Sequence, residues 1–219
     1  MKLPRLYPIL DTALLDARGC LLETAAAAML ESGAGILQIR HKGSWTDAIF
    51  EQAERVAGLC RDAGAPLVID DRADIALLLG AGLHVGQDDL PPADARRLIG
   101  ADATLGYSTH NERQLSDAAR EPVSYVALGP MFATLSKANP DPVVGVERLV
   151  KLRRLTDRPL VAIGGITRAN AGSVIEAGAD SVAVIGDLLP ADCTAAAIRE
   201  RIEDWNRLIS GPTTPDESV

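Results

Sequence analysis

Two adjacent carboxylates end a short apolar run in the stretch Pro66-Leu67-Val68-Ile69-Asp70-Asp71, and the pattern returns in Gly82-Leu83-His84-Val85-Gly86-Gln87-Asp88-Asp89. Apolar residues on consecutive positions are typical of strands buried on both faces, as in a parallel sheet. Such strands rarely end in paired acids, because like charges repel and each carboxylate loses water. A hard divalent cation relieves both costs, and Mg²⁺ commonly takes one or two protein carboxylates together with substrate phosphate. The alternative is that these aspartates cap the N-termini of helices.

Further short apolar runs lie at residues 6–10, 36–40, 104–108, 124–128, 159–163 and 181–185. Helical patterns separate the runs from one another. Together with 66–69 and 82–85, these runs make eight strand-and-helix units. This order predicts an α/β protein folded as a single (β/α)₈ TIM barrel. A doubly wound open sheet is the alternative architecture.

Amphipathic stretches between the runs carry apolar residues at helical spacing. The clearest sets are Ile49, Ala53, Val56, Ala57 and Cys60, and Ile198, Ile202, Trp205 and Ile209. Glycines at 33, 64, 80 and 178 stand shortly before the next run, which is typical of helix C-termini.

The amino-acid composition limits the classes of protein to which this chain can belong. The chain has 219 residues, of which 47% are hydrophobic, enough for one large core. We expect a single barrel domain over residues 1–209, followed by a polar tail over 210–219. A net charge of −8 and 3% aromatic residues argue against binding nucleic acid. No apolar stretch reaches the length of a membrane span.

The three cysteines lie far apart and form no metal-binding spacing. This pattern, together with a start that lacks the long apolar region of a signal peptide, predicts a cytoplasmic protein without disulfides. The sequence is compatible with a homo-oligomer.

Active sites of (β/α)₈ barrels lie at the C-terminal ends of the strands. The polar residues that follow the runs should therefore meet in one mouth. They include an acidic group, Asp70, Asp71, Asp88 and Asp89, and a cationic group, Arg40, Lys42 and Lys137. Cations together with Mg²⁺ suit a diphosphate. Glycines after the last two runs, Gly164-Gly165 and Gly186, suit a second phosphate bound by backbone amides.

The three histidines offer no obvious general base. We expect His84 to be a packed, hydrogen-bonded core residue and His41 to point outward, because it alternates with Arg40 and Lys42. His110 should begin the helix after the fifth strand.

The sequence resembles the thiamine phosphate synthase family over most of its length, from about residue 7 to residue 189. The resemblance rests on the ordered set Gln38-x-Arg40-x-Lys42, Asp71, Gly86-Gln87-Asp88-Asp89, Ser108-Thr109-His110, Gly129-Pro130-Met131-Phe132-x-Thr134-x-Ser136-Lys137 and Ala162-Ile163-Gly164-Gly165-Ile166. Each motif is weak alone, but their order and spacing are specific. The family couples 4-amino-5-hydroxymethyl-2-methylpyrimidine diphosphate with a thiazole phosphate and releases pyrophosphate.

The resemblance implies a role for each matching residue. Asp71 and Asp89 would ligate Mg²⁺. The pyrimidine diphosphate would be held by Gln38, Arg40, Lys42, Asp70, Ser108 and Lys137, of which Arg40, Lys42, Ser108 and Lys137 would act in catalysis. The thiazole phosphate would be held by Thr134, Ser136, Gly165 and the backbone of Ile185-Gly186. Residues 138–144 would form a closing loop.

Three positions depart from the family pattern. Asp70 stands where the family often has Asn, Ser136 where it usually has Thr, and Gly186 where it usually has Ser. Three other functions are alternatives: a thiazole tautomerase on the same barrel, another phosphate-binding barrel such as an isomerase, and a regulatory homologue that binds thiazole phosphate without turnover. The departures at Asp70 and Gly186 bear on the last of these.

Overall fold

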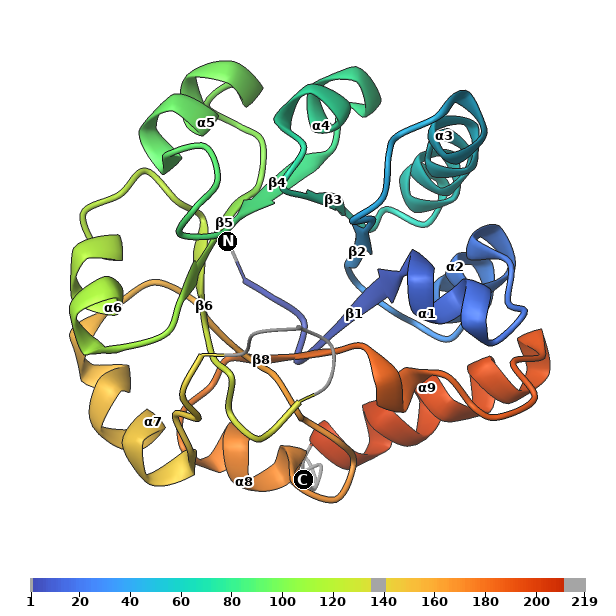
Figure 1. Cartoon of the computed structure of the whole chain (residues 1–219). Coiled ribbons are helices and arrows are strands. Elements are labelled where there is room, and N and C mark those ends of the chain that lie inside the picture. Colours follow the sequence, from blue (N-terminus) through green and yellow to red (C-terminus); the bar gives the residue numbers. More distant parts are fainter. Residues whose placement is uncertain (1, 135–140, 211–219) are drawn as a thin grey trace, which may run out of the picture.

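The computed structural model describes residues 2–134 and 141–210, and its strands form a closed parallel barrel. The strands follow one another around the barrel in chain order (Figure 1): β1 (Leu6–Asp11), β2 (Leu37–Arg40), β3 (Leu67–Asp70), β4 (Gly82–Val85), β5 (Leu105–Thr109), β6 (Tyr125–Leu128), β7 (Leu160–Ile163) and β8 (Ser181–Val184). The last strand pairs with the first, with Leu6 opposite Val182 and Tyr7 opposite Ala183. The TIM barrel is therefore confirmed, and the doubly wound open sheet is wrong because such a sheet leaves its end strands unpaired.

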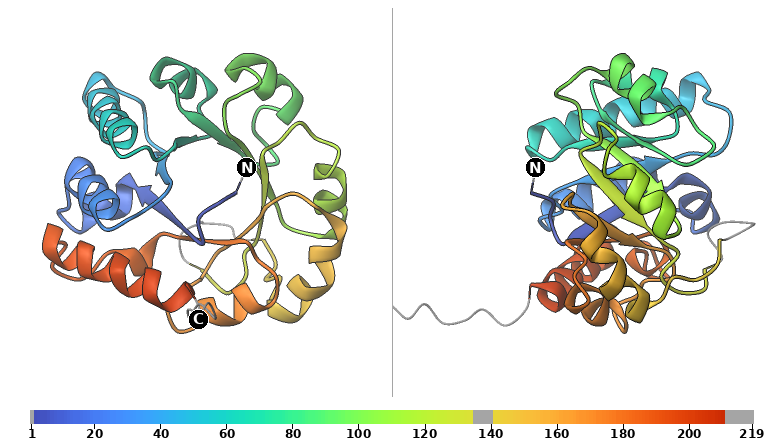
Figure 2. Two further views of the ribbon diagram at one scale, coloured as in Figure 1. Left: turned by 180° about the vertical axis from the view of Figure 1, so that it is seen from behind. Right: turned by 90° about the vertical axis from the view of Figure 1, so that its left-hand side faces the viewer.

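The helices lie outside the strands (Figures 1 and 2). They are α1 (Thr12–Ala17), α2 (Leu22–Glu31), α3 (Asp47–Asp62), α4 (Ala73–Leu79), α5 (Pro92–Ile99), α6 (Glu112–Ala118), α7 (Val146–Leu152), α8 (Ala171–Glu176) and α9 (Ala195–Ile209), with short 3₁₀ turns η1 (Arg153–Leu155) and η2 (Gly186–Leu188). Both predicted apolar helix faces pack against the core, in α3 and in α9.

The predicted glycine stops are confirmed. Gly33, Gly64, Gly80 and Gly178 all have positive φ, between 62° and 105°. Gly80 is itself the C-cap of α4, and the other three follow the C-cap residue by one position. A residue with a Cβ is strained in this conformation, so glycine can end these helices without that conformational strain.

Two apolar layers make up the core. The larger one fills the space between strands and helices, and a smaller one fills the inside of the barrel. The inner layer contains Leu3 from the segment that leads into β1, so this residue lies at the end of the barrel where the strands begin. One end of the barrel is therefore closed by apolar residues, and polar side chains gather at the other.

Strand boundaries correct the prediction in one respect that matters for the site. Asp11, Arg40 and Asp70 are the last residues of their strands, whereas the predicted strands 1 and 3 stop one residue earlier. The parallel ladder continues because these side chains face the mouth of the barrel and do not interrupt backbone pairing. Alternation then places Gln38 and Arg40 on the same inward face of β2.

Other features of the chain agree with the composition. All three cysteines are buried and free. Within the described ranges, no helix has the length and apolar character needed to cross a membrane. The barrel ends with α9 at Ile209, and of the predicted tail only Ser210 is among the described residues. The cytoplasmic location and the oligomeric state stay predictions.

Candidate active site

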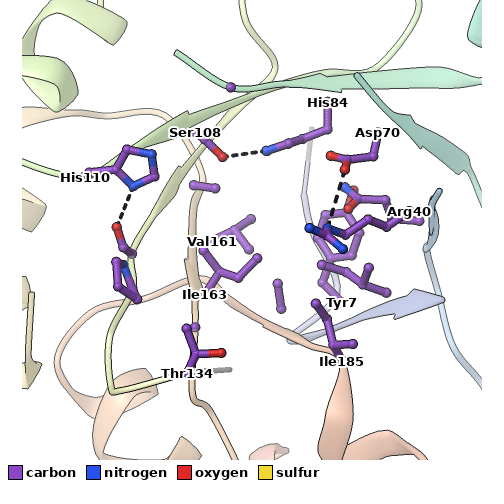
Figure 3. Close-up of a pocket in the computed structure, with 18 of the residues that line it drawn as sticks. Tyr7, Arg40, Asp70, His84, Ser108, His110, Thr134, Val161, Ile163 and Ile185 are labelled. Carbon is purple, nitrogen blue, oxygen red and sulfur yellow. Dashed lines mark hydrogen bonds and ion pairs between the residues drawn. The ribbon is translucent and has the colours of Figure 1, made fainter. Parts of the chain in front are cut away.

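A cavity of about 620 Å³ opens at the C-terminal ends of the strands. Its lining comes from all eight strands or the segments that follow them, so closure of the barrel is what assembles it (Figure 3). Most of the residues predicted to form the site line this cavity: Gln38, Arg40, Lys42, Asp70, Asp71, Asp89, Ser108, Thr134, Gly165 and Ile185. Gly186 is not among the lining residues, and Ser136 and Lys137 lie outside the described residues.

Opposite charges meet on one side of the cavity. Lys42 Nζ lies 2.7 Å from Asp70 Oδ2 and also contacts Asp71 Oδ2, and Arg40 Nε lies 3.7 Å from Asp70 Oδ2. Partial burial of Lys42 acts to lower its pKa, but Asp70 and Asp71 outweigh this and raise it. Lys42 therefore stays charged beside the cavity.

The aspartates predicted to bind metal meet at the ends of neighbouring strands. Asp71 has φ of 62°, a left-handed conformation that is uncommon for a residue with a side chain, and its N–H donates to His84 O at 2.8 Å. Asp89 Oδ2 accepts from Gly86 N–H at 2.7 Å. Burial raises the pKa of the Asp89 carboxyl, the Gly86 hydrogen bond opposes that change, and the negative charge of the nearby Asp71 carboxyl adds to it. Two neighbouring carboxylates repel each other, and a divalent cation would stabilise them.

The donor set bears on which metal would fit. No group of three or more His, Cys, Asp or Glu side chains gathers as a metal centre within residues 2–134 and 141–210. Zinc and other transition metals usually require such a set. Two hard oxygen donors next to a cavity with cationic walls instead suit Mg²⁺, which keeps waters and takes substrate phosphate oxygens.

Sequence reasoning missed Asp11, which positions Arg40. Its Oδ2 accepts from the Arg40 guanidinium, and its Oδ1 accepts from Leu14 N–H at 3.0 Å at the start of α1. Asp11 is the polar residue that ends the first strand, so the rule applied to the later strands would have found it.

The histidines differ partly from expectation. His84 is buried and hydrogen-bonded as predicted, but it also lines the cavity. His110 precedes the Asn111 N-cap instead of beginning α6, and it lines the cavity with Nδ1 2.7 Å from Gly129 O and Nε2 3.6 Å from Asp141 Oδ2. His41 lies outside the cavity lining, with Nδ1 2.7 Å from Thr12 Oγ1. No short-range pattern distinguishes these three environments.

The glycines after β7 have a packing reason that the sequence did not reveal. Gly164 and Gly165 have φ of 96° and 65°. A Cβ at Gly164 would lie 2.6 Å from Pro130 Cβ, and one at Gly165 would lie 2.5 Å from Ala133 O. The loops after β6 and β7 therefore touch here, and both glycines still line the cavity.

A closed (β/α)₈ barrel with a charged cavity at the C-terminal ends of its strands is the architecture of TIM-barrel enzymes that act on small molecules. Comparison with known proteins gives the family: the model of the thiamine monophosphate synthase family matches residues 6–188. The chain belongs to this family, which confirms the resemblance seen in the sequence, and it is a transferase.

Individual relatives agree with this assignment. The thiamine-phosphate synthase of Koribacter versatilis is 49% identical over 86% of this chain and 90% of its own, and that of Chloroflexus aurantiacus is 42% identical over 90% of each. The solved structure of thiamine phosphate pyrophosphorylase from Pyrococcus furiosus has a TM-score of 0.80 and 28% identity, and covers 94% of this chain and 95% of its own.

Proposed function

We propose that this chain condenses 4-amino-5-hydroxymethyl-2-methylpyrimidine diphosphate with a thiazole phosphate, giving thiamine monophosphate and pyrophosphate. Family membership supports the reaction. The observation that carries the proposal is that Asp71, Asp89 and Lys42 line one cavity, with Lys42 paired to Asp71 and the Asp71 charge acting on Asp89. That combination suits a diphosphate leaving group together with Mg²⁺.

Some residues of the mouth would bind the metal ion, and others would bind the diphosphate. Asp71 and Asp89 would hold Mg²⁺, which when bound supplies Lewis-acid stabilisation of the departing pyrophosphate. Lys42 and Arg40 would bind diphosphate oxygens from the β2 side, and Ser108 would bind one from β5. Gln38 would also bind the diphosphate, and so would Lys137, which lies outside the described residues.

The chain needs no general base for this reaction. The aminopyrimidine donates electrons to its exocyclic methylene, so the C–O bond to diphosphate breaks to give a stabilised cation. The thiazole nitrogen then attacks this cation with a lone pair that carries no proton. The protein's task is to stabilise the leaving group, to align the two substrates and to keep water out of the cavity.

The thiazole phosphate would bind on the opposite wall. Thr134, Gly165 and Ile185 line that part of the cavity. Ser136 and the backbone of Gly186 would add contacts, as the family resemblance implies. Gly186 begins the 3₁₀ turn η2 directly after Ile185, so its amide is the group that would serve here.

A turnover assay with and without Mg²⁺ tests the proposal. Purified protein is given both substrates, and thiamine monophosphate and pyrophosphate are measured in Mg²⁺ and in EDTA. We expect both products in equal amounts in Mg²⁺ and neither in EDTA. Proton exchange on a thiazole substrate without metal would instead indicate the tautomerase, and thiazole phosphate binding without any turnover would indicate the regulatory homologue.

A further inference from the structure

A chain of hydrogen bonds crosses the inside of the barrel and ends at Ser108. Gln38 Nε2 donates to Tyr7 Oη at 3.3 Å, and Tyr7 Oη lies 2.8 Å from Tyr125 Oη. Tyr125 Oη lies 2.9 Å from His84 Nδ1, and His84 Nε2 lies 2.8 Å from Ser108 Oγ (Figure 3). Five strands contribute one residue each, and both tyrosines are fully buried. We call Gln38, Tyr7, Tyr125 and His84 the relay, and Ser108 is the residue at which it ends.

Counting donor hydrogens leaves two possible directions for the relay, and the Gln38 contact favours one of them. Each hydroxyl has a single hydrogen to donate. Because the Gln38 amide nitrogen donates to Tyr7, the Tyr7 hydrogen is available to Tyr125, and the Tyr125 hydrogen is available to His84 Nδ1. A neutral imidazole that accepts at Nδ1 carries its hydrogen on Nε2, and that hydrogen is donated to Ser108 Oγ. The Ser108 hydrogen then remains free to point into the cavity.

The reverse direction would give the opposite result. It would start with the Gln38 side-chain oxygen accepting from Tyr7 and would end with Ser108 donating to His84. Ser108 would then offer only lone pairs to a ligand. An anionic diphosphate is an acceptor of hydrogen bonds, so only the first direction makes Ser108 useful for binding it.

Gly106 leaves space for the central contact of the relay. A Cβ at this position of β5 would lie 2.3 Å from Tyr125 Oη and 2.4 Å from His84 Nδ1. Any side chain here would separate the tyrosine hydroxyl from the imidazole. The ring of His84 also stacks on that of Tyr125, with centroids 5.6 Å apart, so its orientation is held by packing as well as by hydrogen bonds.

We propose that the relay Gln38, Tyr7, Tyr125 and His84 holds the imidazole as its Nε2–H tautomer and thereby turns the Ser108 hydroxyl hydrogen toward the diphosphate. Tyr7, Tyr125 and His84 are positioning residues that act through Ser108. The identity of the ligand rests on the proposed function, whereas the tautomer is a property of the free protein.

The tautomer is measured directly by ¹⁵N NMR of the full chain labelled at histidine, without ligand. The His84→Gln variant identifies the His84 signals among the three histidines. We expect an unprotonated Nδ1 and a protonated Nε2 in the wild type, and a mixture of tautomers in Tyr125→Phe. A wild-type Nδ1–H tautomer would overturn the proposal.

Binding of inorganic pyrophosphate in Mg²⁺, followed by calorimetry, measures the consequence. We expect Tyr125→Phe and Ser108→Ala each to weaken binding about tenfold, the effect of losing one hydrogen bond to a charged group. The double variant should bind no more weakly than Ser108→Ala. Ser181→Ala, which removes a buried hydroxyl at the start of β8, should bind as the wild type does.

The outcomes separate the relay from the proposed function. If wild-type protein with the expected tautomer binds no pyrophosphate, the proposed function fails and the NMR result stands. If pyrophosphate binds equally well to wild type and Tyr125→Phe, the relay proposal fails. Should Tyr125→Phe not fold, Tyr7→Phe breaks the relay one bond earlier and is measured in the same two experiments.

Discussion

Among single residues, the two adjacent aspartates at the end of β3 share Lys42 but differ in their other neighbours. Asp71 meets Asp89 and contacts Lys42, whereas Asp70 is buried between Lys42 and Arg40. The left-handed backbone at Asp71 turns the chain between the two side chains. Adjacent residues of the same type can therefore have separate tasks.

Replacing either predicted metal ligand should impair the reaction strongly. We expect Asp71→Ala or Asp89→Ala to lower kcat/KM by at least about a hundredfold, because stabilisation of the leaving group is lost. Both variants should remain folded, since removing one of two neighbouring carboxylates relieves their repulsion. Steady-state kinetics and thermal melting check this, with the exposed Asp94→Ala as control. Full activity of either variant would contradict the assignment.

Asp70→Asn should retain activity and lower the KM for the pyrimidine diphosphate. The Asp70 carboxylate pairs with Lys42 at 2.7 Å and so competes with the substrate for that cation. Removing its charge also removes repulsion toward the diphosphate. A paired titration of substrate and Mg²⁺ in wild type and variant measures both effects, and we expect the Mg²⁺ concentration needed for half-maximal activity to rise. A loss of turnover as large as that of Asp71→Ala would make Asp70 a direct metal ligand.

At the scale of elements, the end of β1, the start of α1 and the end of β2 are joined through one carboxylate. Asp11 caps α1 through Oδ1 and holds Arg40 through Oδ2. A buried carboxylate that is satisfied on both oxygens has little freedom to move. The direction of the Arg40 guanidinium is thus set by a helix terminus.

Two substitutions at Asp11 separate these effects. Asn keeps an oxygen for the helix cap but loses the charge that holds Arg40, whereas Ala loses both. We expect kcat/KM to fall about tenfold in both variants, since a charge-assisted hydrogen bond is lost in each. Unfolding in urea should show Asp11→Ala to be less stable than Asp11→Asn by about 1 kcal/mol, the usual value of an N-cap. Wild-type kinetics in Asp11→Asn would show that Arg40 does not depend on Asp11.

At the scale of the whole molecule, the barrel is closed at one end by its inner apolar layer and open at the other, where all eight strands contribute to one cavity. A ligand bound in that cavity contacts several strands at once. Binding should therefore stabilise the folded barrel as a unit.

Mg²⁺ with inorganic pyrophosphate should raise the melting temperature. At pyrophosphate about 100 times above its Kd the expected stabilisation is about 2.7 kcal/mol, which corresponds to about 5–10 °C for a chain of this size. Pyrophosphate in EDTA should produce a much smaller shift, and Asp71→Ala should lose most of the effect. Equal shifts with Mg²⁺ and with EDTA would speak against a metal-linked diphosphate site.

Much of the fold could be predicted because the relevant signals are local. Apolar runs such as Leu67–Ile69, the helical spacing from Ala53 to Cys60 and the glycine at position 80 each depend on neighbours in the chain. The mouth could also be predicted in outline, because parallel strands deliver the residues at their C-terminal ends to one place.

The eight strand-and-helix units, the family motifs and the set of charged residues at the mouth can all be read from the chain, because burial period, turn chemistry and motif spacing are properties of short segments. Which of these residues touch becomes visible only in the folded barrel. The hydrogen bond between Tyr7 and Tyr125 joins positions 118 residues apart in the chain, and the pairing of β1 with β8 joins the first strand to the last. Such contacts depend on how strands stagger when the barrel closes, and no local pattern encodes that stagger.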